Sequence, residues 1–265
     1  MDLNEMNVRK AFGKQSSIFD EIYTTNPLTE YYRNIYRNEV NKNIGDNSQI
    51  LEINCGTGID AVYFANMGHT ILATDLSPDM LNILSEKIQN LDLSNHIQTQ
   101  VCSFHELSNL GGKKFDFILS GFGGLNCTDR LNKVLEQFSV LLNENGKITL
   151  AVMPKVCPWE ILMLFKGKFK TAFRRFKKKT PAHIEGEHFF CYYYNPGYII
   201  KTLKKDFKLI GLKGVFITVP PEFIHNFVIK HPKLFLFLSR IERKICSIFP
   251  FTQWCDYYII TLQKR

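Results

Sequence analysis

The stretch that decides the fold covers residues 50–61 and reads Ile50-Leu51-Glu52-Ile53-Asn54-Cys55-Gly56-Thr57-Gly58-Ile59-Asp60-Ala61. Its first four residues form a short apolar run typical of a strand, and the residues from Ile59 onward have helical spacing. Gly56 and Gly58 stand between the two. A glycine turn lets a ligand approach the backbone closely, because no Cβ intervenes. The stretch therefore predicts a strand, a turn and a helix with a ligand at the turn.

Strand and helix patterns alternate beyond this unit. Ser77 followed by Pro78 predicts the start of a helix over 80–91. Further helices are expected near 130–142 and 222–249. The expected strands after the first are 70–74, 96–101, 115–119, 147–153, 207–219 and 256–262. This alternation predicts an α/β fold, a Rossmann-like three-layer sandwich whose seven-stranded sheet is mostly parallel with one antiparallel edge strand.

The organisation expected is a single domain over 1–265. It would comprise an N-terminal helical arm at 1–45, a cofactor-binding core at 46–153, a basic and aromatic insertion or lid at 154–195, and C-terminal strands with inserted helices at 196–265. Helices of the arm should lie against the cofactor opening.

Two acidic residues indicate which ligand the turn binds. Asp75 follows the second strand, where a carboxylate can accept hydrogen bonds from ribose hydroxyls. Glu52 ends the first strand, where it would neutralise an ammonium group and repel a pyrophosphate. Gly56, Gly58 and Ala61 also satisfy the dinucleotide pattern, so an NAD(P)-dependent oxidoreductase is the alternative.

Four segments carry a family resemblance. Residues 52–58 resemble the first motif of class I S-adenosylmethionine-dependent methyltransferases of the small-molecule type, and 73–81 their second motif. Residues 115–120 are similar to the fourth-strand motif and 142–147 to the turn before strand five. The resemblance implies S-adenosyl-L-methionine as the cofactor. The cofactor-binding residues that we expect on this basis are Tyr23, Glu52, Asn54, Cys55, Gly56, Thr57, Gly58, Asp75, Leu76, Met80, Cys102, Ser103, Phe104 and Ser120.

The chain departs from the family pattern at two positions. Asn54 replaces the first glycine of the motif, which asparagine should tolerate because it adopts left-handed backbone angles more readily than other residues. Ser103 stands near the position where many relatives place an aspartate beside the adenine amine, and it would accept that hydrogen bond more weakly. Weaker cofactor binding, or a non-catalytic module that binds S-adenosylmethionine, would follow from either change.

The acceptor should lie over the carboxyl ends of the strands, where open α/β sheets bind ligands. Candidate substrate-binding residues there are Phe122, Leu125, Asn126, Met153 and Trp159, although plain core packing would explain several of them. Weak candidates for a base are His183, His188 and Tyr193. A nucleophilic role for Cys127 is disfavoured because no histidine is evidently paired with it. Phe19, Tyr23 and Arg33 of the arm are expected to close the cofactor site.

The charge and the cysteine content limit which partners and which cellular compartment are expected. Seven cysteines without a C-x-x-C pair predict reduced thiols in a cytoplasmic protein and no metal site. Within the net charge of +8, residues 161–179 carry eight lysines and arginines among spaced phenylalanines. This pattern predicts a basic amphipathic helix that caps the site or contacts the inner face of a membrane.

Residues 161–179 have two other interpretations: a solvated helix face, or a nucleic-acid contact of an RNA methyltransferase. The RNA methyltransferase is disfavoured because no RNA-binding signature accompanies the lysines. The acceptor expected is an apolar or aromatic small molecule, lipid-like or derived from a polyketide. Its identity, the methylated atom and the oligomeric state are left open by the sequence.

Overall fold

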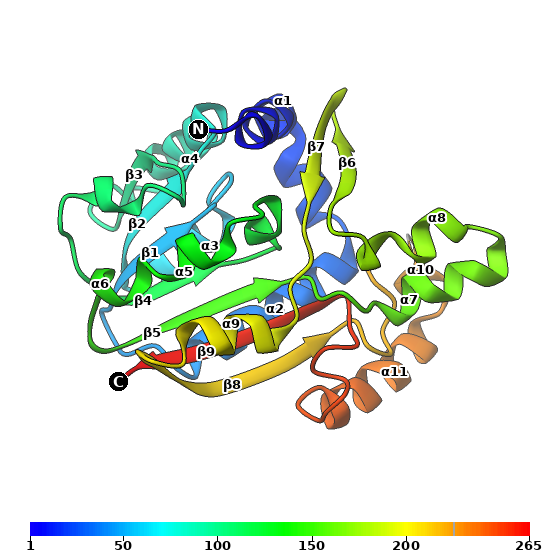
Figure 1. Cartoon of the computed structure of the whole chain (residues 1–265). Coiled ribbons are helices and arrows are strands. Elements are labelled where there is room, and N and C mark those ends of the chain that lie inside the picture. The colour runs from blue at the N-terminus through cyan, green and yellow to red at the C-terminus, as the bar shows by residue number, and fades with distance from the viewer. Residues whose placement is uncertain (225) are drawn as a thin grey trace.

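The computed structural model describes residues 1–224 and 226–265, and its centre is a seven-stranded sheet (Figure 1). The strand order is β3-β2-β1-β4-β5-β9-β8. Their bounds are β1 Gln49–Ile53, β2 Thr70–Asp75, β3 Ile97–Val101, β4 Phe115–Ser120, β5 Leu142–Val152, β8 Phe207–Val215 and β9 Tyr257–Lys264. The first five strands are parallel, and β9 runs antiparallel to both β5 and β8. The predicted sheet, mostly parallel with antiparallel pairing at one edge, is confirmed.

Helices cover both faces of this sheet and complete the predicted three layers. Their bounds are α1 Leu3–Thr24, α2 Pro27–Asn41, α3 Ile59–Ala65, α4 Pro78–Asn90, α5 Leu131–Leu135, α6 Phe138–Leu141, α9 Pro196–Leu203, α10 Phe227–Lys230 and α11 Pro232–Ile245. Because side chains alternate along a strand, Leu51 and Ile53 of β1 pack with α5, α6 and α9. Ile50 instead packs with α2, α3 and α4 on the opposite face.

Local sequence signals explain where two helices begin. The Ser77 hydroxyl accepts from the Met80 N–H at 3.4 Å and Pro78 takes the first helical position of α4, as predicted. At α1, the Glu5 N–H donates to the Asp2 carboxylate while the Asp2 N–H donates to the Glu5 carboxylate, both at 2.9 Å. This reciprocal capping box fixes the start of α1.

Three predicted elements have different limits in the structure. The helix expected over 130–142 is two short helices, α5 and α6, and the turn at 143–146 lies within β5, where Asn145 has a φ of 60°. The strand expected over 207–219 ends at Val215. The reason is Glu242 of α11, whose carboxylate accepts the N–H groups of residues 216–219 at 2.8–3.0 Å in place of a neighbouring strand.

The single amphipathic helix predicted over 161–179 is wrong. The structure has four short helical turns, α7 Pro158–Ile161, η3 Leu162–Lys166, α8 Phe169–Ala172 and η4 Arg174–Phe176. Gly167, with a φ of 69°, ends η3 in a left-handed conformation that cannot continue a right-handed helix. A two-stranded hairpin follows, β6 Thr180–Ile184 and β7 Glu187–Cys191.

Two of the eight basic side chains in this segment point inward. Arg174 and Arg175 both donate to buried Glu160, and Arg175 also donates to the carboxylate of Asp256 beside β9. Cys157, Glu160 and Asp256 together have the spacing of a metal site, but Arg174 and Arg175 already pair with the two carboxylates. This cluster of buried charges attaches the insertion to the sheet.

None of the helices within residues 1–224 and 226–265 has both the length and the apolar character needed to cross a membrane.

Candidate active site

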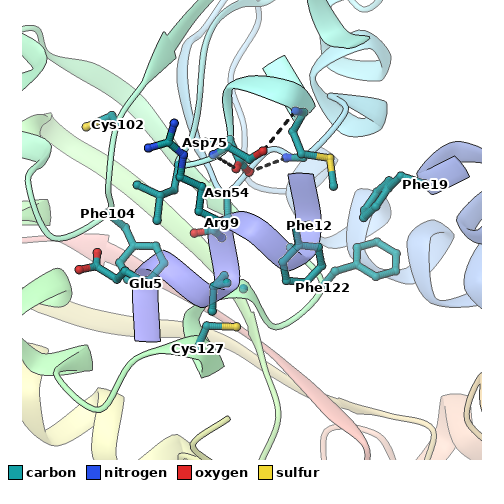
Figure 2. Close-up of a pocket in the computed structure, with 17 residues that line it drawn as sticks. Glu5, Arg9, Phe12, Phe19, Asn54, Asp75, Cys102, Phe104, Phe122 and Cys127 are labelled. Carbon is teal, nitrogen blue, oxygen red and sulfur yellow. Dashed lines mark hydrogen bonds between the residues drawn. The ribbon is translucent and has the colours of Figure 1, made fainter. Parts of the chain in front are cut away.

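A cavity of about 110 Å³ lies between α1 and the carboxyl ends of β1, β2 and β4 (Figure 2). One wall comes from α1, and the other walls come from the loops that follow the strands. The lining residues are Glu5, Val8, Arg9, Phe12, Phe19, Asn54, Gly56, Asp75, Leu76, Ser77, Met80, Cys102, Phe104, Gly121, Phe122, Gly124 and Cys127. We refer to this space as the main cavity.

The turn after β1 has three residues in the left-handed region, Asn54 at φ 49°, Gly56 at 56° and Gly58 at 72°. The expectation that Asn54 tolerates this conformation is confirmed. Gly58 is required for a second reason, since a Cβ on it would lie 2.3 Å from Cδ1 of Leu84 in α4. The turn thus brings the backbone against the cavity while α4 packs closely behind it.

Asp75 is held rigidly at the end of β2. Its two carboxylate oxygens accept the Gly56 N–H at 2.9 Å and the Ser77 N–H at 2.8 Å, as the dashed lines in Figure 2 show. Burial raises the pKa of Asp75, and these backbone hydrogen bonds oppose the shift. Each oxygen retains a lone pair beyond these bonds, so the side chain can still accept a hydrogen bond from a ligand.

A smaller cavity of about 50 Å³ adjoins the main one, with Asn54, Gly56, Phe19, Gly121 and Phe122 lining both. Glu52 lines only the smaller cavity. The Glu52 Oε2 and Asn54 Oδ1 atoms are buried there without a hydrogen-bond partner among residues 1–224 and 226–265. Such groups are costly to leave unpaired, so this space is built to receive a hydrogen-bond donor.

The nearby arginines do not satisfy Glu52. Arg33 and Arg37 both pair with Asp60, at 2.5 and 2.7 Å. Burial, and next the charge of Asp60, hold the pKa of Glu52 well above its usual range. A cation placed in the smaller cavity would reverse this shift, because it would favour the ionised carboxylate.

Hydrogen bonds and an ion pair hold helix α1 in place at both ends of the cavity. Near its start, the buried Ser103 hydroxyl donates to Glu5 at 2.5 Å. Near its end, Asp20 accepts the Thr57 hydroxyl at 2.5 Å and pairs with Lys87 of α4. The Glu5 carboxylate therefore lies next to Ser103, the position where the sequence lacks the acid of the family pattern.

Most of the expected cofactor-binding residues line these two cavities, namely Tyr23, Glu52, Asn54, Cys55, Gly56, Asp75, Leu76, Met80, Cys102 and Phe104. The other four, Thr57, Gly58, Ser103 and Ser120, support the lining from behind, as when Ser120 accepts from the Asn54 amide at 2.6 Å. Sequence reasoning missed the α1 residues Glu5, Val8, Arg9 and Phe12. The Asp2-x-x-Glu5 capping pattern could have indicated where α1 begins.

Of the expected acceptor-binding residues, Phe122 alone lines the cavities. It has a φ of 49°, and its ring lies 4.4 Å from that of Tyr32, 6.0 Å from that of Tyr23 and beneath the Arg33 guanidinium. These contacts hold an aromatic face at the junction of the two cavities.

The other four expected acceptor-binding residues have structural contacts. The Asn126 amide bonds to the backbone of Met153 and Tyr192, and the Trp159 indole donates to the Ile217 carbonyl at 3.1 Å. Leu125 is fully buried in the core. The structure thus places Leu125, Asn126, Met153 and Trp159 outside the lining of the main cavity.

The expected bases also lie outside the main cavity. His183 and His188 face each other across the exposed hairpin, and Tyr193 is buried beneath Arg175. Cys127 does line the main cavity, but a hydrogen bond with Cys191, together with burial, raises the pKa of the Cys127 thiol well above its usual range. A thiolate at this position is therefore disfavoured.

Comparison with known proteins supports one class of chemistry. A family model described as a methyltransferase domain matches residues 50–146. A protein of unknown function from Methanocaldococcus jannaschii is 25% identical over 236 residues, which are 86% of this chain and 87% of the relative.

Two solved structures share the fold. The CcbJ methyltransferase of Streptomyces caelestis has a TM-score of 0.63 at 14% identity and covers 96% of this chain and 98% of its own. The magnesium protoporphyrin IX methyltransferase of Synechocystis PCC 6803, solved with bound S-adenosylhomocysteine, has a TM-score of 0.61 at 12% identity. It covers 99% of this chain and all of its own. At these identities the likeness concerns the fold alone.

Proposed function

We propose that the chain is a class I S-adenosylmethionine-dependent methyltransferase that methylates an apolar or aromatic small molecule. The match to a methyltransferase domain supports the activity, and the acceptor class goes beyond that match. The observation that carries it is the composition of the two adjoining cavities. Polar groups lie where the cofactor would be held, and the Phe19 and Phe122 rings, which line both cavities, are the apolar surface offered to an acceptor.

The residues present fit the cofactor. Glu52 Oε2 and Asn54 Oδ1 are buried acceptors without a partner, as the ammonium of a methionine tail requires. Asp75 is positioned to accept from ribose hydroxyls, and Leu76 and Phe104 supply apolar contacts for an adenine. When bound, the cofactor supplies a methyl group on a positively charged sulfur. The contribution of the protein is then to align the acceptor and exclude water.

The proposed function is tested by calorimetric titration and a transfer assay. The purified chain should bind S-adenosylhomocysteine and not NAD, because Glu52 repels a pyrophosphate. A tritiated methyl donor should label compounds in the apolar fraction of a cell extract. Binding of NAD with none of S-adenosylhomocysteine, or label found only in RNA, would refute it.

A second part of the proposal concerns an anionic membrane surface. From α7 to the three residues that follow η4, six lysines are exposed near Phe165, Phe169, Phe173 and Phe176, which are themselves 50–89% exposed. The α11 segment lies on the same side of the molecule (Figure 1). It adds exposed Leu234, Leu236, Phe237, Ile248 and Phe249, with basic residues between them. Apolar and basic side chains that share one exposed surface match the interfacial region of an anionic bilayer.

Liposome co-sedimentation tests the membrane contact. We expect binding to vesicles that contain phosphatidylglycerol and little binding to neutral phosphatidylcholine vesicles. Phe165→Ser combined with Phe169→Ser should weaken binding at least tenfold, since each buried phenylalanine contributes roughly 1.5–3 kcal/mol. Val140→Ser, on exposed α6, is the matched control and should change nothing. Equal binding of all variants, or none by the unaltered chain, would exclude the contact.

A further inference from the structure

A third cavity, of about 410 Å³, lies where the junction of α1 and α2 meets residues 222–223 and 226–229. Its lining is mainly apolar and comprises Ile22, Tyr23, Thr25, Asn26, Pro27, Leu28, Thr29, Glu222, Phe223, Asn226, Phe227, Val228 and Ile229. We propose that this cavity binds the acceptor and that Glu222 takes the proton from the acceptor's hydroxyl group. The inference rests on the proposed function, because it names the acceptor chemistry of the same enzyme.

The third cavity adjoins the cofactor site through Tyr23, which lines both it and the smaller cavity of Glu52. The Tyr23 ring lies 4.4 Å from that of Phe19 and 6.0 Å from that of Phe122, and these two rings line the main cavity. One aromatic wall therefore separates the third cavity from the place of the cofactor. A molecule in it would approach the cofactor past Tyr23 and Phe122.

Glu222 is the one carboxylate among the residues that line the third cavity. Its Oε1 atom is enclosed and has no hydrogen-bond partner within the described residues, although its backbone carbonyl accepts from the Asn26 amide at 3.4 Å. A buried acceptor left unpaired in the free protein indicates a donor that arrives with a ligand. The carboxylate has a hydrogen bond with the Thr29 side chain, while its Oε1 atom is left open to a ligand.

The surroundings of Glu222 suit a base. Burial, and next the charge of Asp256, raise the pKa of Glu222 to about 7. The charged and titratable groups around it come from α1, α2 and the start of β9, and are Tyr23, Tyr32, Arg33, Asp256 and Tyr257. Such a carboxylate is largely ionised just above neutral pH and still accepts a proton readily.

The apolar lining selects a neutral acceptor. Phe223, Phe227, Val228 and Ile229 would desolvate a charged molecule with only one carboxylate to compensate it, which is unfavourable. A neutral hydroxyl needs only one hydrogen-bond acceptor. In the reaction, its oxygen forms the bond to the methyl carbon, the carbon–sulfur bond breaks with its electron pair left on sulfur, and the hydroxyl proton passes to Glu222.

Ligand-observed NMR with a matched pair of probes tests the inference. At pH 8, with S-adenosylhomocysteine present, we expect the chain to bind 2-naphthol about tenfold more tightly than 2-methoxynaphthalene, which has no hydroxyl proton. Glu222→Gln should abolish most of this preference, since the hydrogen bond is then no longer charge-assisted. The preference of the unaltered chain should fall between pH 8 and pH 6, as Glu222 gains a proton.

The control is Glu30→Gln, an exposed glutamate on neighbouring α2, which should retain the preference. Affinity for S-adenosylhomocysteine, measured in parallel, should be the same in all three proteins. If the unaltered chain does not bind S-adenosylhomocysteine, the proposed function itself is wrong. Normal affinity with no naphthol binding, or with a preference that survives Glu222→Gln, would overturn the role of Glu222 alone.

Discussion

Replacing Glu52 with glutamine should change folding and binding in opposite directions. In the free protein, Glu52 is a buried carboxyl group with one oxygen unpaired and a raised pKa. A buried unsatisfied polar group costs about 1–3 kcal/mol. Because the neutral amide of Glu52→Gln removes the charge but not the burial, we expect a gain of about 1 kcal/mol, or roughly 2–4 °C in Tm.

The same substitution should weaken cofactor binding severely. Breaking one partner of a buried charge pair costs roughly 2–5 kcal/mol, which corresponds to a Kd about 30-fold to 5,000-fold larger. At 100 times its Kd, S-adenosylhomocysteine should stabilise the unaltered chain by about 2.7 kcal/mol. That stabilisation should fall to about 0.9 kcal/mol or less for Glu52→Gln at the same concentration.

The assay is thermal unfolding with and without S-adenosylhomocysteine, at several pH values. A folded-state pKa raised above the unfolded value means that Glu52 favours folding below its unfolded pKa, near 4.5, and that this contribution is lost as pH rises through the folded pKa. Glu52→Gln should remove that part of the slope. Glu86→Gln, an exposed residue of α4, is the control. Affinity within threefold of the unaltered chain would refute the assignment of Glu52 to the ammonium.

Three further substitutions and one control test the turn after β1, Asp75 and the buried charge cluster. Gly58→Ala should destabilise the fold by about 2 kcal/mol or more, since the new Cβ meets Leu84 at a positive φ; urea unfolding measures this. Gly111→Ala, which has a φ of 68° and open space around it, isolates the backbone strain and should cost less. Asp75→Asn should weaken S-adenosylhomocysteine about tenfold to a hundredfold by calorimetry, because a charged hydrogen bond contributes roughly 1.5–3 kcal/mol; unchanged affinity would exclude a ribose contact. Arg175→Ala should lower the free energy of unfolding by about 3–5 kcal/mol, as buried Asp256 loses its cation while Glu160 keeps only Arg174; a change below 1 kcal/mol in denaturant titration would contradict this reading of the cluster.

The parts of the site that the sequence predicted are those set by local patterns. Strands β1 and β2, the turn at 54–58 and Asp75 follow from short apolar runs, glycines and capping residues within about 30 positions. The left-handed conformation of Asn54 could be predicted for the same reason, because it depends on one residue's steric preference. Neighbouring residues along the chain were enough for these features.

The remaining features depend on contacts between distant parts of the chain. Glu5 reaches Ser103 across 98 positions, so no local window could place α1 in the wall of the cavity. The helix predicted over 161–179 was wrong because Gly167 ends a turn and Arg175 is drawn inward by Asp256, 81 residues away. Glu222 carried no motif, and its surroundings arise only when the segment folds over the junction of α1 and α2.

The position of α1 has a consequence for turnover. Ligand pockets usually measure about 300–1,000 Å³, whereas the main cavity has only about 110 Å³ with α1 in place. An outward swing of α1 would enlarge this space for cofactor exchange, and it would break the hydrogen bonds of Glu5 with Ser103 and of Asp20 with Thr57. If the spent cofactor leaves by this route, the rate at which the helix detaches would set an upper limit on catalytic cycles per second.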